Sequence, residues 1–394
     1  ARPQPARPPA RPPSTQGVSI VFNGPYGSDE PYRGGGGVSV IPTPQRARRG
    51  EHRTRRTGPR IAALTVSHSD TALTQAQVLE RLGLTGNEFA ESIFARSGVE
   101  RRHLNLDGAF LARTLQERTE EVERELLHHS IKAVDAMRID PTEIGTVISA
   151  SLYSLGVPTL AHRLIEHYGM DPTTDKYHIT GVGCAGAVPL MRLAAQTLSE
   201  QPDSYTLVVA AESMSSIQMP ATAQDPKAKT VGAAIFGDGC AAALLSRHPR
   251  AQGPLILASQ VHQIGATLGA VSLDLTDQYL HLARELPDLA GAGLPGIVGG
   301  FLARHGLERA DIDHWIVHPG GRRIIENVQS ALELSREDVA TSWDALADHG
   351  NIGTPSIMYV LKDTIERHRP QPGERGLMVT IGPGVTVGMT LLGW

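Results

Sequence analysis

Strand-like and helix-like segments alternate along this chain from Ile61 to the C-terminus. Runs rich in β-branched and apolar residues predict strands at 60–66, 145–151, 176–181, 205–211, 240–245, 255–261, 312–318, 376–381 and 388–392. Apolar residues at helical spacing predict helices after Thr74 and at about 115–137, 159–168, 185–198, 296–305, 322–332 and 355–368. Such alternation over short loops is typical of an α/β fold with largely parallel or mixed sheets.

The alternation occurs twice along the sequence. The segments before residue 245 and those after it follow a similar order, which indicates a duplicated architecture, although no sequence repeat proves it. We therefore expect a tail at 1–60, an N-terminal half at 61–245 and a C-terminal half at 246–394.

Residues 1–60 differ from the rest of the chain in composition. They hold eleven arginines, no lysine, three acidic residues and 11 of the 27 prolines, for a net charge of +8. Such a segment cannot bury enough surface to offset its ordering entropy, so we expect a disordered tail with at most a short strand at 38–41. It lacks the apolar stretch of a secretory signal. Its arginine clusters leave contact with nucleic acid open as an additional property, but a solvated tail is favoured.

The composition of the whole chain excludes several classes of protein. Of 394 residues, 40% are hydrophobic and 20% charged, so most of the chain can bury a core. No stretch approaches about 18 uninterrupted apolar residues, so no membrane-spanning helix and no membrane partner are expected. Two cysteines outside any C-x-x-C pair exclude a disulfide scaffold and argue against a zinc ribbon, which makes the reducing cytoplasm the expected compartment.

Cys184 lies where a predicted strand ends in a glycine-rich turn and a helix begins. At a helix N-terminus, free N–H groups and the helix dipole favour a thiolate, so we expect a lowered thiol pKa. The small residues Ala185, Gly186 and Ala187 would let a substrate carbonyl reach backbone N–H groups, as an oxyanion hole requires. The alternative is a buried structural thiol, which is the role expected for Cys240 in its alanine-rich run.

Two other segments place polar side chains at the ends of predicted elements. His318 follows an apolar strand and precedes a glycine-rich turn, and Asn351 lies between the end of one helix and the start of the next. In α/β proteins, ligands bind where strands end in loops. A thiol, an imidazole and a carboxamide match one way of performing acyl transfer. The thiolate takes the acyl group, the imidazole activates the thiolate, and imidazole and amide together hold negative charge on a thioester oxygen.

The motifs around these residues resemble those of a known enzyme family. They are Gly-Cys-Ala-Gly at 183–186, Phe-Gly-Asp-Gly-Cys-Ala-Ala at 236–242, His-Pro-Gly-Gly at 318–321, Gly-Asn at 350–351 and Gly-Pro-Gly-Val-Thr at 382–386. In this order, the motifs resemble type III polyketide synthases of the bacterial type, in the chalcone synthase-like branch of the thiolase superfamily. The resemblance implies a thiolase-like five-layered αβαβα fold with two pseudo-duplicated halves, usually assembled as a homodimer.

The resemblance also implies a role for each polar residue. Cys184 would be the nucleophile that carries the starter and the growing chain. His318 would keep this thiol ionised and polarise the malonyl thioester, and Asn351 would help to stabilise the enolate left by decarboxylation. Acyl-CoA and malonyl-CoA are the implied substrates, with no metal or other cofactor. The Claisen condensation could repeat and end in cyclisation to a pyrone or a resorcinol.

Residues around the substrate follow from the same resemblance. Phe236 matches the gatekeeper phenylalanine of the family, and Leu280 falls on the second gatekeeper position, where it lacks the aromatic ring. The other residues expected to contact substrate are Met214, Ile217, Gly353, Gly321, Gly384 and, for the CoA phosphates, Arg96. Leu152, Met214 and Ile217 replace smaller or polar residues of plant members, and Gly353 replaces their serine. We therefore expect a reshaped apolar pocket and an aliphatic starter.

The chain departs from the family pattern at several positions. Phe89 and Ser92 stand where the family has basic residues for CoA phosphates, so CoA binding is expected to be weaker or differently arranged, or an acyl carrier protein delivers one substrate. Thr380 replaces a glycine of the family, and Gly388 replaces its glutamate.

Two other functions remain open. A ketoacyl-ACP synthase III-like enzyme would use the same three residues for a single condensation, but its His-Gln-Ala-Asn and Gly-Asn-Thr-Ser motifs differ from His-Pro-Gly-Gly and Gly-Asn-Ile-Gly here. A non-catalytic partner subunit of the same fold is disfavoured because all three polar residues are present.

Overall fold

The structure is a computed structural model that describes residues 58–106, 113–154, 156–215, 227–273 and 280–394. Ile217, one of the residues expected at the substrate, lies outside these residues. The strand predicted at 38–41 and the tail before residue 58 also lie outside them.

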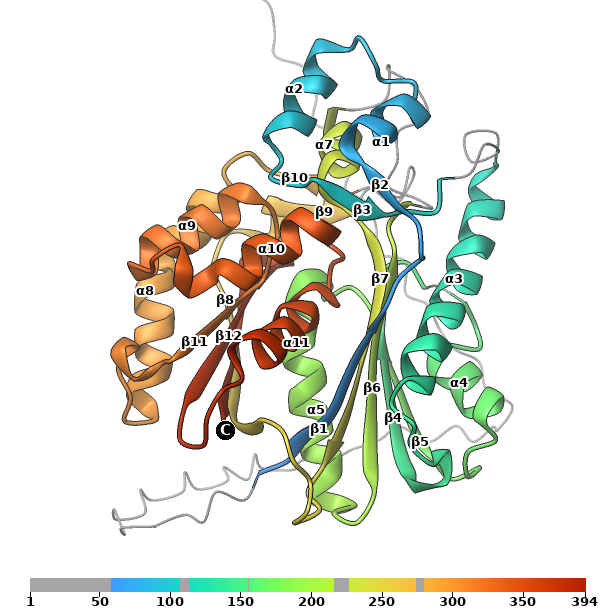
Figure 1. The fold of residues 1–394 in the computed structure, drawn as a ribbon, viewed down its shortest axis with the longest axis vertical. Helices are drawn as coiled ribbons and strands as arrows, with labels where there is room; N and C mark the ends of the chain where they lie inside the picture. Colours follow the sequence, from blue (N-terminus) through green and yellow to red (C-terminus); the bar gives the residue numbers. More distant parts are fainter. Residues whose placement is uncertain (1–57, 107–112, 155, 216–226, 274–279) are drawn as a thin grey trace, which may run out of the picture. The chain divides into compact units, whose positions relative to one another are not determined.

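The predicted alternation of strands and helices is confirmed (Figure 1). The strands are β1 (Arg60–Ser67), β2 (Ala72–Thr74), β3 (Arg101–His103), β4 (Ile144–Ala150), β5 (Asp175–Ile179), β6 (Tyr205–Ser213), β7 (Asp238–Ser246), β8 (Leu255–Gln263), β9 (Val271–Leu273), β10 (Leu280–Leu282), β11 (His314–Val317), β12 (Arg375–Gly382) and β13 (Thr386–Gly393). The α-helices are α1 (Gln75–Arg81), α2 (Glu88–Arg96), α3 (Leu115–Asp135), α4 (Leu160–Tyr168), α5 (Ala187–Glu200), α7 (Lys227–Ile235), α8 (Leu286–Arg304), α9 (Arg322–Leu332), α10 (Ala340–His349) and α11 (Ser356–His368).

The helix predicted at 296–305 is longer than expected, because α8 begins at Leu286. Its N-terminal part contains Pro287, Gly291, Gly293 and Pro295, which weaken the helical sequence pattern. Pro287 lies in the first turn, where a missing N–H costs no intrahelical bond. The packing of α8 on α9 and β13 holds the rest of this segment helical.

The large sheet has the strand order β11-β12-β13-β8-β1-β7-β6-β4-β5. In the N-terminal half, β1 pairs antiparallel with β7, β7 antiparallel with β6, and β6 parallel with β4. In the C-terminal half, β8 pairs antiparallel with β13, β13 antiparallel with β12, and β12 parallel with β11. The two halves therefore repeat one strand order, and they join where Arg60 of β1 meets Leu255 of β8.

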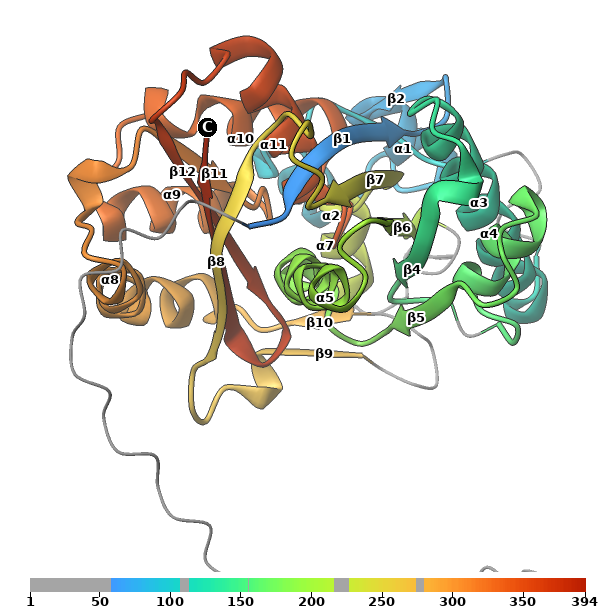
Figure 2. The ribbon, with the colours of Figure 1, turned by 90° about the horizontal axis from the view of Figure 1, so that it is seen from below.

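Helices separate and cover the two parts of this sheet. α5 contacts β4, β6, β8 and β13, and α11 contacts β1, β7, β11 and β12, so both helices lie between the halves (Figure 2). α3 packs on β1, β6 and β7, and α4 packs on α3, β4 and β5; on the other side, α8 packs on β13 and α9 packs on α8. The layers therefore follow one another as helices, strands, helices, strands and helices, which is the predicted five-layered arrangement.

One helix within the described residues, α8, is long and apolar enough to cross a membrane by length and composition. The expectation that no such helix exists was based on uninterrupted apolar runs, and Asp288 and several glycines interrupt this one. In the structure, α8 contributes Leu294, Val298 and Phe301 to the core beneath α9 and β13.

Candidate active site

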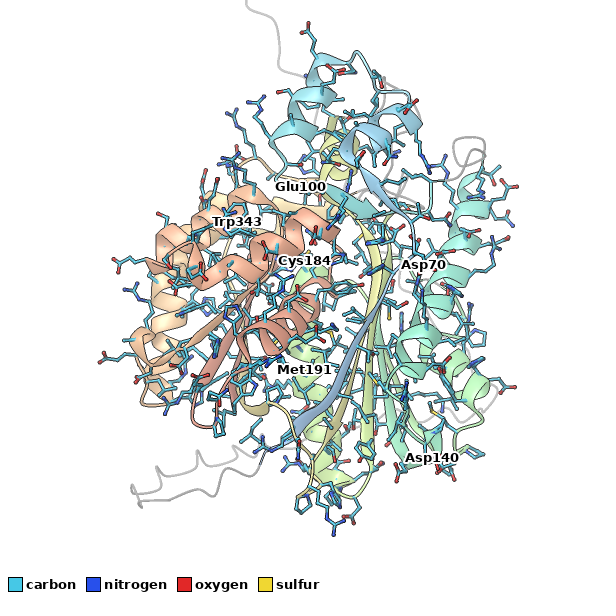
Figure 3. The ribbon with its side chains drawn as sticks, viewed as in Figure 1. Asp70, Glu100, Asp140, Cys184, Met191 and Trp343 are labelled. Carbon is cyan, nitrogen blue, oxygen red and sulfur yellow. The ribbon has the colours of Figure 1, made fainter. Side chains whose placement is uncertain are left out.

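Cys184, His318 and Asn351 lie at the ends of three different elements and line one cavity. Cys184 is in a 3₁₀ turn, Gly183–Ala185, that leads into α5 between the two halves (Figure 3). His318 directly follows β11, and Asn351 follows α10 after one glycine. The cavity contains about 560 Å³ of non-atom space, a figure that includes open solvent at its mouth.

Close backbone packing fixes the turn that carries Cys184. Gly183 has φ +49°, and its carbonyl accepts a hydrogen bond of 2.7 Å from the hydroxyl of Thr354. A Cβ on Gly382 would lie 2.6 Å from the backbone N of Ala185, so only glycine lets the loop after β12 close against this turn. The thiol is therefore held by two loops from the C-terminal half.

The side-chain amide of Asn351 has a defined orientation. Its Oδ1 accepts a hydrogen bond of 2.8 Å from the N–H of Gly353, and its Nδ2 donates one of 3.2 Å to the carbonyl of Gly320. Oδ1 and Nδ2 each lie 3.7 Å from Sγ of Cys184. One N–H of the amide is thus directed toward the thiol, where a thioester oxygen would sit.

The backbone of Asn351 is joined to the segment that carries Phe236. The N–H of Asn351 donates to the carbonyl of Ile235 at 2.7 Å, and the N–H of Gly237 donates to the carbonyl of Asn351 at 3.0 Å. Phe236 and Asn351 therefore form a parallel β-bridge across the two halves of the chain. The gatekeeper candidate and the catalytic amide candidate share one rigid piece of backbone.

His318 is buried beside a glycine that leaves room for its ring. A Cβ on Gly320 would lie 3.2 Å from Cδ2 and 3.3 Å from Nε2 of this imidazole. Among the described residues, neither ring nitrogen has a hydrogen-bond partner. Burial lowers the pKa of His318 to about 3. A neutral imidazole with two unpaired nitrogens on a cavity wall can accept a proton from a thiol or donate one to a substrate oxygen.

Burial also raises the pKa of the Cys184 thiol to about 12, with the hydrogen bond to Asn351 lowering it and the Glu212 carboxylate raising it further. The expectation of a lowered thiol pKa is therefore wrong, while the expectation that His318 keeps the thiol ionised stays a prediction. The cause is the apolar wall around the thiol, which outweighs the dipole of a helix that begins only at Ala187. Burial thus disfavours the charged form of both the thiol and the imidazole.

The structure places four of the expected substrate residues on the cavity: Met214, Phe236, Leu280 and Gly353. Leu152 lies there too. The sequence did not predict the remaining apolar lining, which consists of Val271, Leu282, Leu286, Ile324, Ile381 and Pro383. Pro383 belongs to the Gly-Pro-Gly-Val-Thr motif, but the other five lie on strands and helices without a motif, where an apolar residue that faces a cavity looks the same as one in the core.

Three expected substrate residues do not line the cavity. Gly321 precedes α9 with φ +143°, and Gly384 has φ +64° in the turn between β12 and β13, so each serves its turn while a neighbouring residue, Gly320 or Pro383, lines the cavity. Arg96 is exposed at the end of α2, where its Nε donates to the carbonyl of Ser92 at 3.2 Å. Its contact with CoA stays a prediction.

A buried carboxyl group beside the cavity was not predicted from the sequence. Glu212 accepts hydrogen bonds from the hydroxyl of Ser151 at 3.1 Å and from the N–H of Leu152 at 3.0 Å. Burial raises the pKa of Glu212 to about 8. A Cβ on Gly353 would lie 3.3 Å from its Cγ, so the carboxyl stands directly behind the cavity wall. The sequence signal for this residue was an acidic side chain at the end of the apolar run of β6.

Comparison with known families gives two matches that follow one another along the chain. Residues 62–264 match the family described as FAE1/Type III polyketide synthase-like protein. Residues 302–394, which include His318 and Asn351, match the C-terminal domain of 3-oxoacyl-[acyl-carrier-protein] synthase III. The first match spans more than half of the chain.

The chain belongs to the type III polyketide synthase family. The synthase is 28% identical over 378 residues to the 3,5-dihydroxyphenylacetyl-CoA synthase of Streptomyces toyocaensis, which covers 90% of this chain and 92% of the relative. It is 31% identical over 280 residues to a putative chalcone synthase of Bacillus subtilis, covering 69% and 76%. It is an acyltransferase that performs decarboxylative Claisen condensations with malonyl-CoA on an acyl thioester.

The fold of the synthase is that of solved members of the family. The crystal structure of PKS-I from the brown alga Ectocarpus siliculosus superimposes with a TM-score of 0.78 at 26% identity, over 85% of this chain and 98% of that one. The predicted thiolase-like architecture is thus confirmed.

Two departures of the synthase from the family pattern compensate each other. Thr380 of β12 and Gly388 of β13 are direct partners across the two strands. The hydroxyl of Thr380 donates to the carbonyl of Gly388 at 3.3 Å, and a Cβ at residue 388 would collide with this hydroxyl. The larger residue on one strand therefore requires the glycine on the other.

Proposed function

We propose that this synthase extends an aliphatic acyl-CoA starter with malonyl-CoA, holds the chain on Cys184, and releases a pyrone or a resorcinol after several extensions. One observation supports the choice of starter. Among the described residues that line the cavity, the polar side chains are those of Cys184, His318 and Asn351, and all others are apolar or glycine.

An apolar wall discriminates against a hydroxylated aromatic starter. A phenolic hydroxyl that enters the cavity beyond these three residues would lose its water and find no side-chain donor or acceptor on the described wall. Leaving a buried polar group unpaired costs about 1–3 kcal/mol. An alkyl chain meets no such penalty and gains from burial against residues such as Met214 and Leu280.

In the proposed loading step, His318 takes the proton of Cys184 while the thiol attacks the carbonyl carbon of the acyl-CoA. The new C–S bond forms to Cys184, the bond to CoA breaks, and the CoA thiolate leaves with the proton from His318. Burial raises the pKa of Cys184 and lowers that of His318, so it opposes formation of this ion pair in the free enzyme.

In the proposed extension step, His318 and the Nδ2–H of Asn351 hold the thioester oxygen of malonyl-CoA. The carboxylate leaves as CO₂, and its bonding electrons form an enolate whose oxygen these two donors stabilise. The enolate carbon attacks the acyl carbon on Cys184, and the Cys184 thiolate leaves. The product is a β-ketoacyl-CoA that can reload on the same thiol. The step draws on the CoA thioesters and these side chains alone.

The starter is tested by offering the purified enzyme octanoyl-CoA, coumaroyl-CoA or no starter, each with malonyl-CoA, and by identifying the products by mass spectrometry. We expect pyrones or resorcinols with an alkyl chain from octanoyl-CoA, and a lower kcat/KM for coumaroyl-CoA. A clear preference for coumaroyl-CoA, or products from malonyl-CoA alone at the same rate, would refute the aliphatic starter. A Cys184→Ala variant controls for uncatalysed chemistry.

The form of the substrate carrier and the assembly are part of the proposal. Because Phe89 and Ser92 are not basic, malonyl-ACP should be compared with malonyl-CoA as extender. A much higher rate with malonyl-ACP would mean that the carrier protein, and not CoA, delivers the extender.

We further propose a cytoplasmic homodimer, as the family resemblance implies, and light scattering on the purified protein measures its mass directly.

A further inference from the structure

A cluster of three histidines lies outside the cavity and has no part in the condensation. His68 follows β1, His103 ends β3, and His349 is the last residue of α10. One ring nitrogen from each histidine lies within 4.8 Å of those of the other two. Three segments that are far apart in the sequence thus bring three imidazoles to one point.

The three rings pack against one another without a carboxylate between them. The centroids of His68 and His103 are 3.6 Å apart in a stacked arrangement, and that of His349 lies 5.4 and 5.5 Å from them. The nearby acids pair with other residues, since Asp348 contacts Arg101 at 2.7 Å and Asp70 contacts Lys132 at 2.8 Å. Protonated rings at these distances would repel one another, so the cluster is stable only with neutral rings.

Two of the three rings carry a buried nitrogen without a hydrogen-bond partner. His103 is 7% exposed, and its Nδ1 has no hydrogen-bond partner among the described residues; the same holds for Nδ1 of His349. A buried lone pair without a donor is costly. His68 Nδ1 lies 2.9 Å from the carbonyl of Ser69, which fixes the proton on Nδ1 and leaves Nε2 as a lone pair. A group that accepts several lone pairs at once would satisfy all three rings.

We propose that His68, His103 and His349 bind one divalent transition-metal ion of the Zn²⁺ class through three neutral imidazole nitrogens. Three nitrogens without a carboxylate suit Zn²⁺, Co²⁺, Ni²⁺ or Cu²⁺ and not Mg²⁺ or Ca²⁺, which prefer oxygen. Zn–N distances of about 2.0–2.1 Å place tetrahedral ligand atoms about 3.3 Å apart, so binding requires the ring nitrogens to draw together and the His68 and His103 rings to turn out of their stacked arrangement.

His68 lines an open cleft together with Ser69, Asp70 and Thr71, whereas His103 and His349 do not line it. A bound ion would tie β1, β3 and the end of α10 together.

The test uses the full-length protein without an affinity tag, stripped by a chelator and reloaded with Zn²⁺ alone. We expect one ion per chain by elemental analysis, and with Co²⁺ the visible absorption of a four-coordinate nitrogen site. His68→Gln and His349→Gln should each weaken binding at least about 10-fold. The matched controls are His167→Gln, at an exposed histidine of α4, and Cys184→Ala, which removes the accessible thiol; both should bind as the wild type does.

X-ray absorption at the zinc edge keeps the proposal testable if a variant fails to fold. We expect nitrogen scatterers with imidazole features and no sulfur. Less than one ion per wild-type chain, unchanged binding in both cluster variants, loss of binding in Cys184→Ala, or a sulfur ligand would each overturn the proposal.

Discussion

Cys184 and Cys240 are the two cysteines of the chain, and burial raises the pKa of each thiol to about 12. Cys240 is fully buried in β7, and its Sγ lies 3.8 Å from the hydroxyl of Ser130. Cys184 is half-buried on a cavity wall, 3.7 Å from the amide of Asn351 and on the same cavity as His318. Resting ionisation therefore does not distinguish a nucleophile from a structural thiol, whereas access and partners do.

The sharpest break between the two thiols is expected in catalysis. Cys184→Ala should lower the rate of product formation at least about 10³-fold, because it removes the covalent carrier, while malonyl-CoA and starter still bind. Cys240→Ala should keep the wild-type rate, measured by mass spectrometry of the products. Equal losses in both variants would mean that the fold, and not a nucleophile, had been damaged.

Removing the side-chain amide of Asn351, which lies beside Cys184, is expected to have the next largest effect. Asn351→Ala takes away one of two proposed donors to the enolate oxygen and should cost about 10²–10³ in kcat, or about 2.7–4 kcal/mol. Decarboxylation of malonyl-CoA, followed as CO₂ release, should fall with it. Ser130→Ala, the corresponding change beside Cys240, should leave kcat unchanged, and a similar loss there would contradict the assignment of Asn351.

Alkylation by iodoacetamide measures access and ionisation together. For a thiol with a pKa of about 12, the thiolate fraction rises about tenfold with each unit of increase in pH, as long as the pH stays below the pKa. Labelling of Cys184 should therefore rise about 100-fold from pH 7 to pH 9. Cys240 should stay unlabelled in the folded protein. A labelling rate for Cys184 that is flat over this range would show a thiolate already formed with His318.

The smallest effect is expected in stability. Cys240→Ala removes a packed sulfur from β7 and should lower the free energy of unfolding by about 1 kcal/mol, seen as a slightly lower Tm. Cys184 has cavity space on one side, so Cys184→Ala should change Tm less. A larger loss for Cys184→Ala would assign it a structural role as well.

The sequence predicted what short motifs encode. The turn at Cys184, the ends of β11 and α10, and the helix at 322–332 follow from local patterns, and the structure places them as expected. The thiol pKa was predicted wrongly, because burial depends on apolar residues that distant segments contribute.

Local patterns could not predict the apolar residues that line the cavity or the cluster of three histidines. Ile324 and Leu282 look like core residues in sequence, and Glu212 is one acid among 41 acidic residues. His68, His103 and His349 have no regular spacing, and only the folded arrangement of β1, β3 and α10 brings them together.

The bridge between Phe236 and Asn351 limits how this enzyme can change its substrates. A mutation that shifts the backbone at Phe236, to admit a bulkier starter, would also move the amide of Asn351, which we propose to stabilise the enolate oxygen. Substrate range and turnover would then vary together, and new specificities would arise more readily at side chains such as Leu280, which lie on other strands. In evolution or in engineering, a new product is therefore reached more readily by changing such side chains than by moving the bridge between Phe236 and Asn351.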